Sequence, residues 1–259
     1  MKIITWNINS VRLRLPIVLD LLADQQPDIL CLQETKCPDE HFPHDAFDEA
    51  GYPYRAIRGE KGYNGVAIIA KIPLHQITHE LWAGKEDCRH IAATTDDGLT
   101  VHNFYIPAGG DVPDVAANEK FAHKLNFLDE LMAWGPAQAD GDAVLVGDLN
   151  IAPGEDDVWS HKQLLKVVSH TPIECEKLAA VMAAGAWQDV VRDMIPDGKL
   201  YSWWSYRARD WDAADKGRRL DHVWMTPSMA PRVKAATVLR HARGWEKPSD
   251  HAPVVVEWS

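Results

Sequence analysis

Short apolar runs followed by polar or turn-forming residues recur along the chain. This pattern predicts buried strands that end in loops. Asp96-Asp97-Gly98 lies between two such runs and is a hairpin signal. The expected strands are Lys2–Trp6, Asp28–Leu32, Gly65–Ala70, His90–Thr95, Leu99–Tyr105, Asp142–Val146, Leu220–Met225, Ala235–Leu239 and Pro253–Trp258.

Three other segments repeat apolar residues at the spacing of one helix face. The first tolerates Pro16 in its opening turn and ends at Pro27, because proline fits the start of a helix but not its interior. The expected helices are Arg12–Gln26, Ala116–Trp134, with Phe121, Leu125, Leu128, Leu131 and Met132 on one face, and Cys175–Ala184.

No linker, charge block, low-complexity tract or tandem repeat divides the sequence. Strands outnumber helices, and the helices are interspersed among them. We therefore expect residues 1–259 to form one α/β domain, with two β-sheets face to face and helices outside. Asn7-Ile8-Asn9 after one strand echoes Asp148-Leu149-Asn150-Ile151 after another, which hints at two similar halves.

Composition is that of a globular protein, with 46% hydrophobic and 25% charged residues, so a sizeable core is expected. The net charge of −11 argues against a uniformly basic nucleic-acid binder. The segment Lys199–Lys247 nevertheless holds 11 of the 27 Lys and Arg but 5 of the 38 Asp and Glu, a net of +6. Either this is chance clustering, or a basic face on an acidic body meets a polyanion.

The four cysteines show neither C-x-x-C pairing nor regular spacing, so no zinc ribbon or disulfide framework is indicated. The chain begins directly with a strand pattern, and it contains neither a signal-peptide pattern nor a long apolar run. We therefore expect a soluble cytoplasmic protein without a membrane segment.

Asp148 and Asn150 follow the strand Asp142–Val146 and are two residues apart. Residues at this spacing point to the same side of an extended chain. A carboxylate beside a carboxamide suits a cation or a phosphate. The alternative is a structural Asp-x-Asn turn, because both residue types are favoured in turns. Further polar residues directly follow β-rich runs, and these would converge along one edge of the sandwich: Asn7, Asn9, Glu34, Tyr105, Asp221, His222, Asp250 and His251.

These strand-end residues belong to six ordered motifs that span almost the whole chain. The motifs resemble those of the exonuclease III family, within the endonuclease/exonuclease/phosphatase superfamily. The resemblance implies a four-layered α/β sandwich, divalent-metal dependence and hydrolysis of DNA phosphodiesters. The motifs are Trp6-Asn7-Ile8-Asn9, Leu32-Gln33-Glu34-Thr35-Lys36, Asn103-Phe104-Tyr105-Ile106-Pro107, Gly147-Asp148-Leu149-Asn150, Arg219-Leu220-Asp221-His222 and Ser249-Asp250-His251.

A divalent cation would neutralise the phosphate, and Mg²⁺ favours one or two carboxylates while keeping waters. Glu34 is therefore the first candidate ligand, and its structural alternative is a salt bridge with Lys36. Mn²⁺ is a possible substitute. The candidate metal ligands are Asn7, Glu34, Asp148, Asn150 and Asp250.

The expected catalytic residues have separate roles. Asp221 and His251 fit a carboxylate–imidazole pair, in which a protonated His251 holds a phosphate oxygen. Asp148 would activate water or protonate the leaving oxygen, and the sequence leaves open whether Asp148 or Asp221 is the base. Asn150 would bind the phosphate or orient water, and Tyr105 would donate a hydrogen bond from its phenol.

The segment around Arg207 to Arg219 interleaves cations with aromatic residues, which suits a phosphate backbone and an unstacked nucleotide. The resemblance places Trp203 against the sugar of an abasic nucleotide, although a core tryptophan is the structural alternative. Arg218 stands where some members place an apolar residue, and Ala108 stands where some carry an amide. The candidate DNA contacts are Asn9, Trp203, Arg207, Arg218 and Arg219.

The leading hypothesis is a Mg²⁺-dependent DNA repair nuclease that cleaves duplex DNA 5′ to abasic sites, 3′→5′ from an end, or both, and cleans 3′ ends. A phosphoesterase of the same fold acting on RNA, a phospholipid or an inositol phosphate is one alternative. A non-catalytic DNA-binding relict is another, but intact acids at every motif weigh against it. The expected partner is double-stranded DNA, and a monomer is the default.

Overall fold

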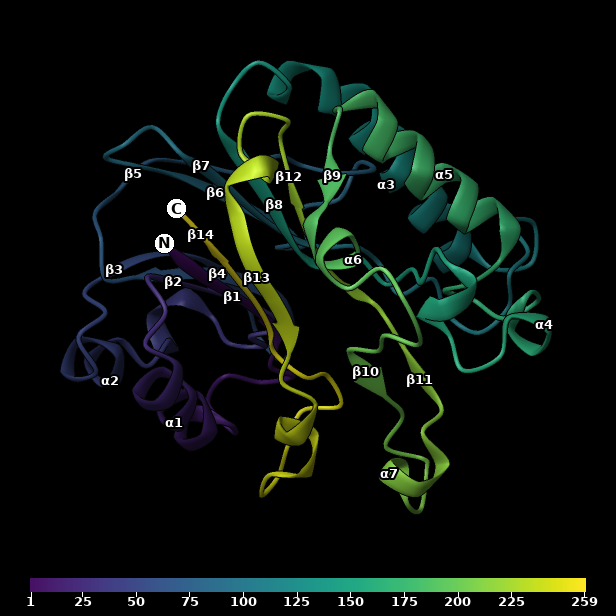
Figure 1. Cartoon of the computed structure of the whole chain (residues 1–259), viewed down its shortest axis with the longest axis horizontal. Helices are drawn as coiled ribbons and strands as arrows, with labels where there is room; N and C mark the ends of the chain where they lie inside the picture. The colour runs from purple at the N-terminus through teal and green to yellow at the C-terminus, as the bar shows by residue number, and fades with distance from the viewer.

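The computed structural model describes residues 1–259 as two six-stranded sheets packed face to face with helices outside (Figure 1). One sheet has the order β13-β14-β1-β2-β4-β3, and the other has the order β5-β6-β7-β8-β12-β9. The first contains β1 (Lys2–Asn7), β2 (Ile29–Gln33), β3 (Tyr54–Glu60), β4 (Tyr63–Ala70), β13 (Val233–Val238) and β14 (Val254–Trp258). The second contains β5 (Leu74–Thr78), β6 (His90–Thr95), β7 (Thr100–Tyr105), β8 (Ala143–Asp148), β9 (Gln188–Asp189) and β12 (Asp221–Met225).

Each sheet is mixed and has one parallel pair at its centre, β1 with β2 and β7 with β8. The other pairings within both sheets are antiparallel. This shared arrangement agrees with the two similar halves hinted at by the sequence. A separate short hairpin projects from the sandwich and consists of β10 (Trp203–Trp204), α7 (Trp211–Ala214) and β11 (Gly217–Arg218) (Figure 1).

The helices form the two outer layers. In Figure 1, α1 and α2 lie beside the first sheet, and α3 and α5 lie side by side over the second. None of the helices has the length and the apolar character that crossing a lipid bilayer requires. The remaining helices are α1 (Leu15–Gln25), α2 (His44–Glu49), α3 (Glu119–Trp134), α4 (His161–Leu164), α5 (Pro172–Ala184) and α6 (Val190–Met194).

Strand alternation divides the apolar residues among three cores, because successive side chains point to opposite faces of a sheet. Ile3 and Val144 belong to the core between the two sheets. Their neighbours face outward: Ile4 packs with α1 and α2, and Leu145 packs with α3 and α5. The layers are therefore helix, sheet, sheet, helix, which confirms the predicted four-layered α/β sandwich.

The predicted strands are confirmed with shifts of one or two residues at their ends, whereas helix starts are less accurate. Helix α3 begins at Glu119 rather than Ala116, because the side chain of Asn118 caps it by accepting a hydrogen bond from Lys120 N. Met132, which was expected on the apolar face of this helix, is 37% exposed, and Phe127 is buried.

Candidate active site

Four strands place polar residues at one edge of the sandwich. Asn7, Tyr105 and Asp148 are the last residues of β1, β7 and β8, and Asp221 is the first residue of the antiparallel β12. The register of the second sheet sets Tyr105 and Asp221 directly on either side of Asp148. The predicted convergence is therefore present for these strand ends. His222 is the exception, because it is fully buried outside the cavity with its Nε2 2.8 Å from the carbonyl oxygen of Ile151.

Gly147 allows this edge to form. Its φ angle is +142°, and a Cβ atom at this position would lie 1.9 Å from the carbonyl oxygen of Phe104 on β7. Glycine is needed wherever a backbone must approach this closely. The Gly-Asp step thus brings β8 against β7 and delivers Asp148 into the site.

His251 lies between two aspartates. Its Nδ1 is 2.8 Å from Asp221 Oδ2, and its Nε2 is 3.6 Å from Asp148 Oδ2. Ser202 fixes the carboxylate of Asp221. Its hydroxyl donates to Asp221 Oδ2 at 2.6 Å and accepts a hydrogen bond from the backbone N–H of Asp221 at 3.0 Å. The imidazole is thereby held with its Nε2 toward Asp148.

The electrostatics of this trio follow from burial and opposed charges. Burial disfavours the charged imidazole, but Asp221 and Asp148 outweigh this effect and raise the pKa of His251. Burial also raises the pKa of Asp148, with Asp221 adding to the rise and His251 opposing it. The imidazole of His251 is therefore protonated at neutral pH, and the carboxylate of Asp148 has an elevated pKa.

Glu34 and Asp148 are joined through Asn7. The Asn7 amide donates to Glu34 Oε1 at 2.9 Å and to Asp148 Oδ2 at 2.8 Å. The Tyr105 hydroxyl also donates to Glu34 Oε1 at 2.9 Å, and burial next to Glu34 raises the pKa of this phenol, so it remains a donor. Lys36 pairs with Glu34 Oε2 at 2.8 Å.

Glu34 forms a salt bridge with Lys36 and also lies where a metal ligand is expected. Burial would raise the pKa of Glu34, but Lys36 and the Asn7 amide outweigh it and lower the pKa, so Glu34 is a carboxylate at neutral pH. The salt bridge that was the structural alternative for Glu34 is therefore present, and it engages Oε2 of the carboxylate.

Asp250 and Asn150 face the same site from other loops. Asp250 Oδ2 accepts a hydrogen bond from Trp203 Nε1 at 2.9 Å, and Oδ1 accepts one from Asn9 at 3.3 Å. Asn150 adopts a left-handed backbone conformation (φ +54°), and its amide donates to the carbonyl of Ile106 at 2.9 Å. That bond engages the nitrogen of the amide and leaves its oxygen for a ligand.

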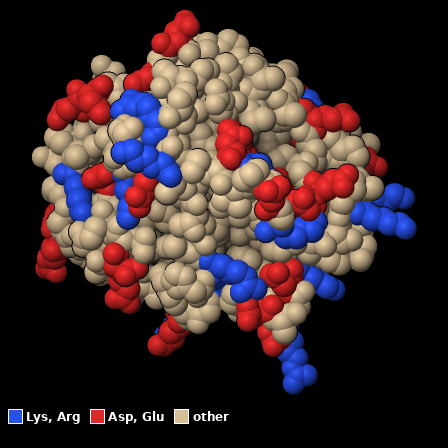
Figure 2. Space-filling view, in the orientation of Figure 1, with Lys and Arg blue, Asp and Glu red and all other residues tan.

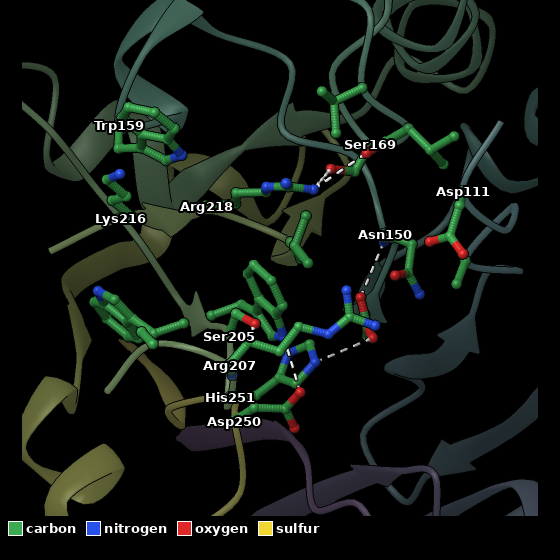
Figure 3. Close-up of a pocket in the computed structure, with 18 of the residues that line it drawn as sticks. Asp111, Asn150, Trp159, Ser169, Ser205, Arg207, Lys216, Arg218, Asp250 and His251 are labelled. Carbon is green, nitrogen blue, oxygen red and sulfur yellow. Dashed lines mark hydrogen bonds and ion pairs between the residues drawn. The ribbon is translucent and has the colours of Figure 1, made fainter. Parts of the chain in front are cut away.

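These groups open into a cavity of about 740 Å³ (Figure 3). Glu34, Tyr105, Asp148 and His251 line it, and aromatic and cationic side chains form much of the rest of its wall. The aromatic and cationic residues of this wall are Trp159, Trp203, Trp204, Trp211, Arg207, Lys216 and Arg218.

Arg218 is held rigidly in this wall. Its Nη1 donates to the carbonyl of Val168 at 3.1 Å and to Ser169 Oγ at 2.7 Å. The guanidinium lies over the ring of Trp203, 5.2 Å from its centroid. Neither Arg218 nor the neighbouring Arg207 forms an ion pair within the chain, so both positive charges remain for an anionic ligand.

The prediction that Arg219 contacts DNA is wrong. The side chain is 2% exposed and does not line the cavity. Its guanidinium donates to both oxygens of Asp157, at 2.7 and 2.9 Å, and to Asp189 at 2.6 Å. Two carboxylates therefore neutralise its charge, and Arg219 cross-links the loops behind the site.

The basic face predicted for Lys199–Lys247 is smaller than the charge count indicated, because carboxylates neutralise some of its cations. Arg240 pairs with Asp212 and Asp215, and Arg232 pairs with Asp142. Basic and acidic side chains are interspersed over the face shown in Figure 2. Within Lys199–Lys247, the unpaired cations that can act at the site are therefore the ones that line the cavity.

Sequence reasoning missed three residues that shape the site. Ser202 orients Asp221, Trp159 lines the cavity beneath Lys216, and Ser169 holds Arg218. Ser202 directly precedes a pair of tryptophans, but a serine there carries no signal by itself. Trp159 and Ser169 lie in loops whose approach to the site depends on the whole fold.

Comparison with known proteins identifies the class. The model of the endonuclease/exonuclease/phosphatase family matches residues 4–251. Exodeoxyribonuclease III of Haemophilus influenzae is 32% identical over 272 aligned residues, with 100% of both chains covered. The chain therefore belongs to the endonuclease/exonuclease/phosphatase family.

Two solved structures are similar along the full chain. One is a variant of the 3′ phosphatase NExo from Neisseria bound to a product DNA hairpin, and the other is an AP endonuclease from Archaeoglobus fulgidus. Each is 34% identical, has a TM-score of 0.93, and is matched over 100% of this chain and 99% of its own. These similarities confirm the exonuclease III-like resemblance of the sequence motifs.

Proposed function

We propose that this protein is a divalent-metal-dependent DNA repair nuclease that hydrolyses phosphodiesters in duplex DNA, 5′ to abasic sites, 3′→5′ from an end, or both, and that removes groups blocking 3′ ends. The observation that carries the proposal is that Asp148 and His251, two members of the Asp148–His251–Asp221 trio, line the same cavity as a group of cationic and aromatic side chains. The similarity to an exodeoxyribonuclease III and to an AP endonuclease supports it.

The donor set fits a hard divalent cation. The candidates are carboxylate and amide oxygens, with no cysteine among them, which favours Mg²⁺ and allows Mn²⁺. Glu34 would hold the cation, and Asp250 and Asn150 are the further candidates. Asn7 would support Glu34 through its amide nitrogen, because its own oxygen accepts the backbone N–H of Asn9. A bound cation would neutralise charge on the phosphate and on the leaving oxygen.

Asp148 is the better candidate for the base that activates water. It lines the cavity, whereas Asp221 is fully buried behind the imidazole and bonded to Ser202. A pKa raised toward neutrality suits a base, because such a carboxylate accepts a proton more readily. Asp221 then orients His251 and sustains its charge.

The remaining polar groups stabilise the phosphate. The His251 imidazolium points Nε2 into the cavity, where it can hold a phosphate oxygen. Tyr105 offers a phenolic donor beside Glu34, and Asn150 offers its amide. Developing negative charge thus meets donors that are already fixed, and this preorganisation is a large term in enzyme catalysis.

The aromatic and cationic residues of the cavity wall would bind the DNA. Trp203 presents a ring on which a sugar or base can pack, and Arg207 and Arg218 supply charge for the backbone. Asn9 lies at the edge of the site, bonded to Asp250 and to Lys36.

Replacing Glu34 with alanine is expected to raise the Mg²⁺ concentration that gives half-maximal activity by at least about tenfold, because a charged ligand is lost. The measurement is a Mg²⁺ titration of the initial rate on a defined duplex. Glu40→Ala, at an exposed carboxylate of the following loop, is the matched control. An unchanged titration curve for Glu34→Ala would remove this residue from the cation site.

Replacing Arg207 or Arg218 with alanine is expected to weaken DNA binding and to reduce the slope of log affinity against log salt by about 0.9 for each phosphate that is no longer neutralised. Fluorescence anisotropy with a labelled duplex in EDTA measures this without turnover. Arg232→Ala serves as control, since Arg232 is paired with Asp142 and lies outside the cavity. The same slope in both variants as in the wild type would mean that this wall does not contact the backbone.

The test of the proposed function uses end-labelled duplexes that carry an abasic-site analogue, a 3′ phosphate or a recessed 3′ end. Each is incubated with the wild-type protein in Mg²⁺, and again in EDTA. We expect hydrolysis of at least one of these DNA substrates in Mg²⁺ and none in EDTA. Absence of product from all three in Mg²⁺, with hydrolysis of an RNA or a phospholipid instead, would replace the proposal by the phosphoesterase alternative.

A further inference from the structure

A second charged cluster lies directly behind the cavity. Lys124 on α3 and Glu174 on α5 are both fully buried, and their charged groups are 2.5 Å apart. A buried ion pair is a poor source of stability, because desolvating both charges costs about as much as their attraction returns. The hydrogen bonds that each partner makes with the backbone indicate a different use.

Lys124 fixes two loops that form the catalytic side of the cavity. Its ammonium donates to the carbonyl of Asn150 at 2.8 Å and to that of Ala108 at 3.3 Å. These residues follow β8 and β7, and Asn150 is the residue with the left-handed backbone. The stem of the lysine fills the space beside Gly109, where a Cβ atom would lie 2.9 Å from Lys124 Cδ. The Lys124 ammonium thus fixes the backbone of Asn150 through its carbonyl oxygen.

Glu174 fixes the loop that forms the DNA side of the cavity. Its two oxygens accept the backbone N–H of Ser169 at 3.0 and 2.9 Å, and one of them accepts the Thr171 hydroxyl at 2.6 Å. The hydroxyl of Ser169 in turn accepts the hydrogen bond of Arg218. The carboxylate therefore sets the position of Arg218 through one intermediate residue.

We propose that Lys124 and Glu174 are positioning residues, and that their ion pair sets the placement of Asn150 relative to Arg218. The pair joins the loop that carries the catalytic amide to the loop that holds the DNA-binding guanidinium. Neither residue lines the cavity, so both act through others. The inference rests on the proposed function for the roles of Asn150 and Arg218.

The two partners have separate expected effects. Lys124→Met releases the Asn150 carbonyl and is expected to lower kcat by about 10- to 100-fold with little change in KM, since small misplacements of reacting groups carry costs of this size. Glu174→Gln loosens Ser169 and is expected to weaken DNA binding in EDTA by about 3- to 10-fold through Arg218, an effect typical of one weakened charge interaction.

The same helices offer a matched control, because Lys177 on α5 pairs with Asp129 on α3 at the surface. Lys177→Met and Asp129→Asn should leave kcat and DNA affinity at wild-type values. All variants are assayed at a temperature well below their melting temperatures. The double variant Lys124→Met/Glu174→Gln removes both buried charges together, and it is expected to fold even if a single variant does not.

A purely structural role predicts that melting temperatures fall while kcat and DNA affinity stay at wild-type values in the folded variants. That result, or full recovery of both activities in the double variant, would overturn the positioning role. A double variant that recovers its melting temperature but keeps a low kcat would support it. A wild-type protein that binds DNA without cleaving it would refute the proposed function, and the affinity of Glu174→Gln would still test the Glu174–Arg218 link.

Discussion

Asp148→Asn is expected to lower kcat by about 10²-fold or more on any DNA substrate that the wild type cleaves, because the amide cannot accept the proton of the attacking water. The substitution preserves the shape of the side chain. It removes a buried carboxylate, and burial has already raised the pKa of this group. The fold should therefore persist, and circular dichroism and thermal melting check this. The loss of activity would then report chemistry rather than unfolding.

The matched control for this variant is Asp140→Asn, at an exposed carboxylate on the loop before β8. Its kcat should equal that of the wild type. Single-turnover rates separate the chemical step from product release. Wild-type single-turnover rates in Asp148→Asn would exclude this residue as the base and leave Asp221 as the alternative.

Asp221→Asn is expected to lower kcat by a comparable factor, on the order of 10²-fold, through His251 rather than through water. The carboxylate raises the pKa of His251, so the imidazolium persists above its ordinary titration range. Without this charge the pKa of His251 falls, and the imidazolium is lost at a lower pH. The alkaline limb of the kcat profile should therefore move to lower pH.

The pH profile distinguishes this role from a structural one. In the wild type, activity should rise as pH increases through the elevated pKa of Asp148 and fall as pH passes the elevated pKa of His251, which gives a bell shape. A purely structural loss in Asp221→Asn would lower the whole curve without moving its limbs. An unmoved alkaline limb would contradict the assigned link between Asp221 and His251.

Much of the fold was predictable because short apolar runs bounded by turn residues mark the central strands, where both faces are buried. Edge strands gave weaker signals. The segment Leu74–Thr78, which forms β5, is largely exposed and carries no apolar alternation. The two-residue strands β10 and β11 exist only because Trp203 and Arg218 meet in a hairpin, which local periodicity does not record.

The strand-end residues of the site were predictable for a geometric reason. Residues at strand ends must lie at a sheet edge. This brought Tyr105 and Asp148, at the ends of parallel strands, together with Asp221, at the start of the antiparallel β12. Residues of the projecting hairpin and of its junction with β12 followed no such rule. Arg219 and Arg218 are adjacent in sequence, yet one is neutralised by buried carboxylates and the other faces the cavity.

Lys124 shows the same limit inside a helix. It stands beside the apolar face of α3, where a lysine ordinarily reaches solvent. Only the packing of α5 against α3 supplies Glu174, and only the loop after β8 supplies the Asn150 carbonyl. A buried ion pair of this kind depends on three distant segments, so no local pattern predicts it.

The most direct test of metal-dependent hydrolysis at this site follows the cleavage of one labelled duplex that carries a single abasic-site analogue and a recessed 3′ end. The wild type and Asp148→Asn are compared side by side in Mg²⁺ and in EDTA. We predict that only the wild type in Mg²⁺ yields products, either by incision at the analogue or by shortening from the 3′ end. Equal product from Asp148→Asn, or from the wild type in EDTA, would contradict metal-dependent hydrolysis at the site formed by Asp148, His251 and Asp221.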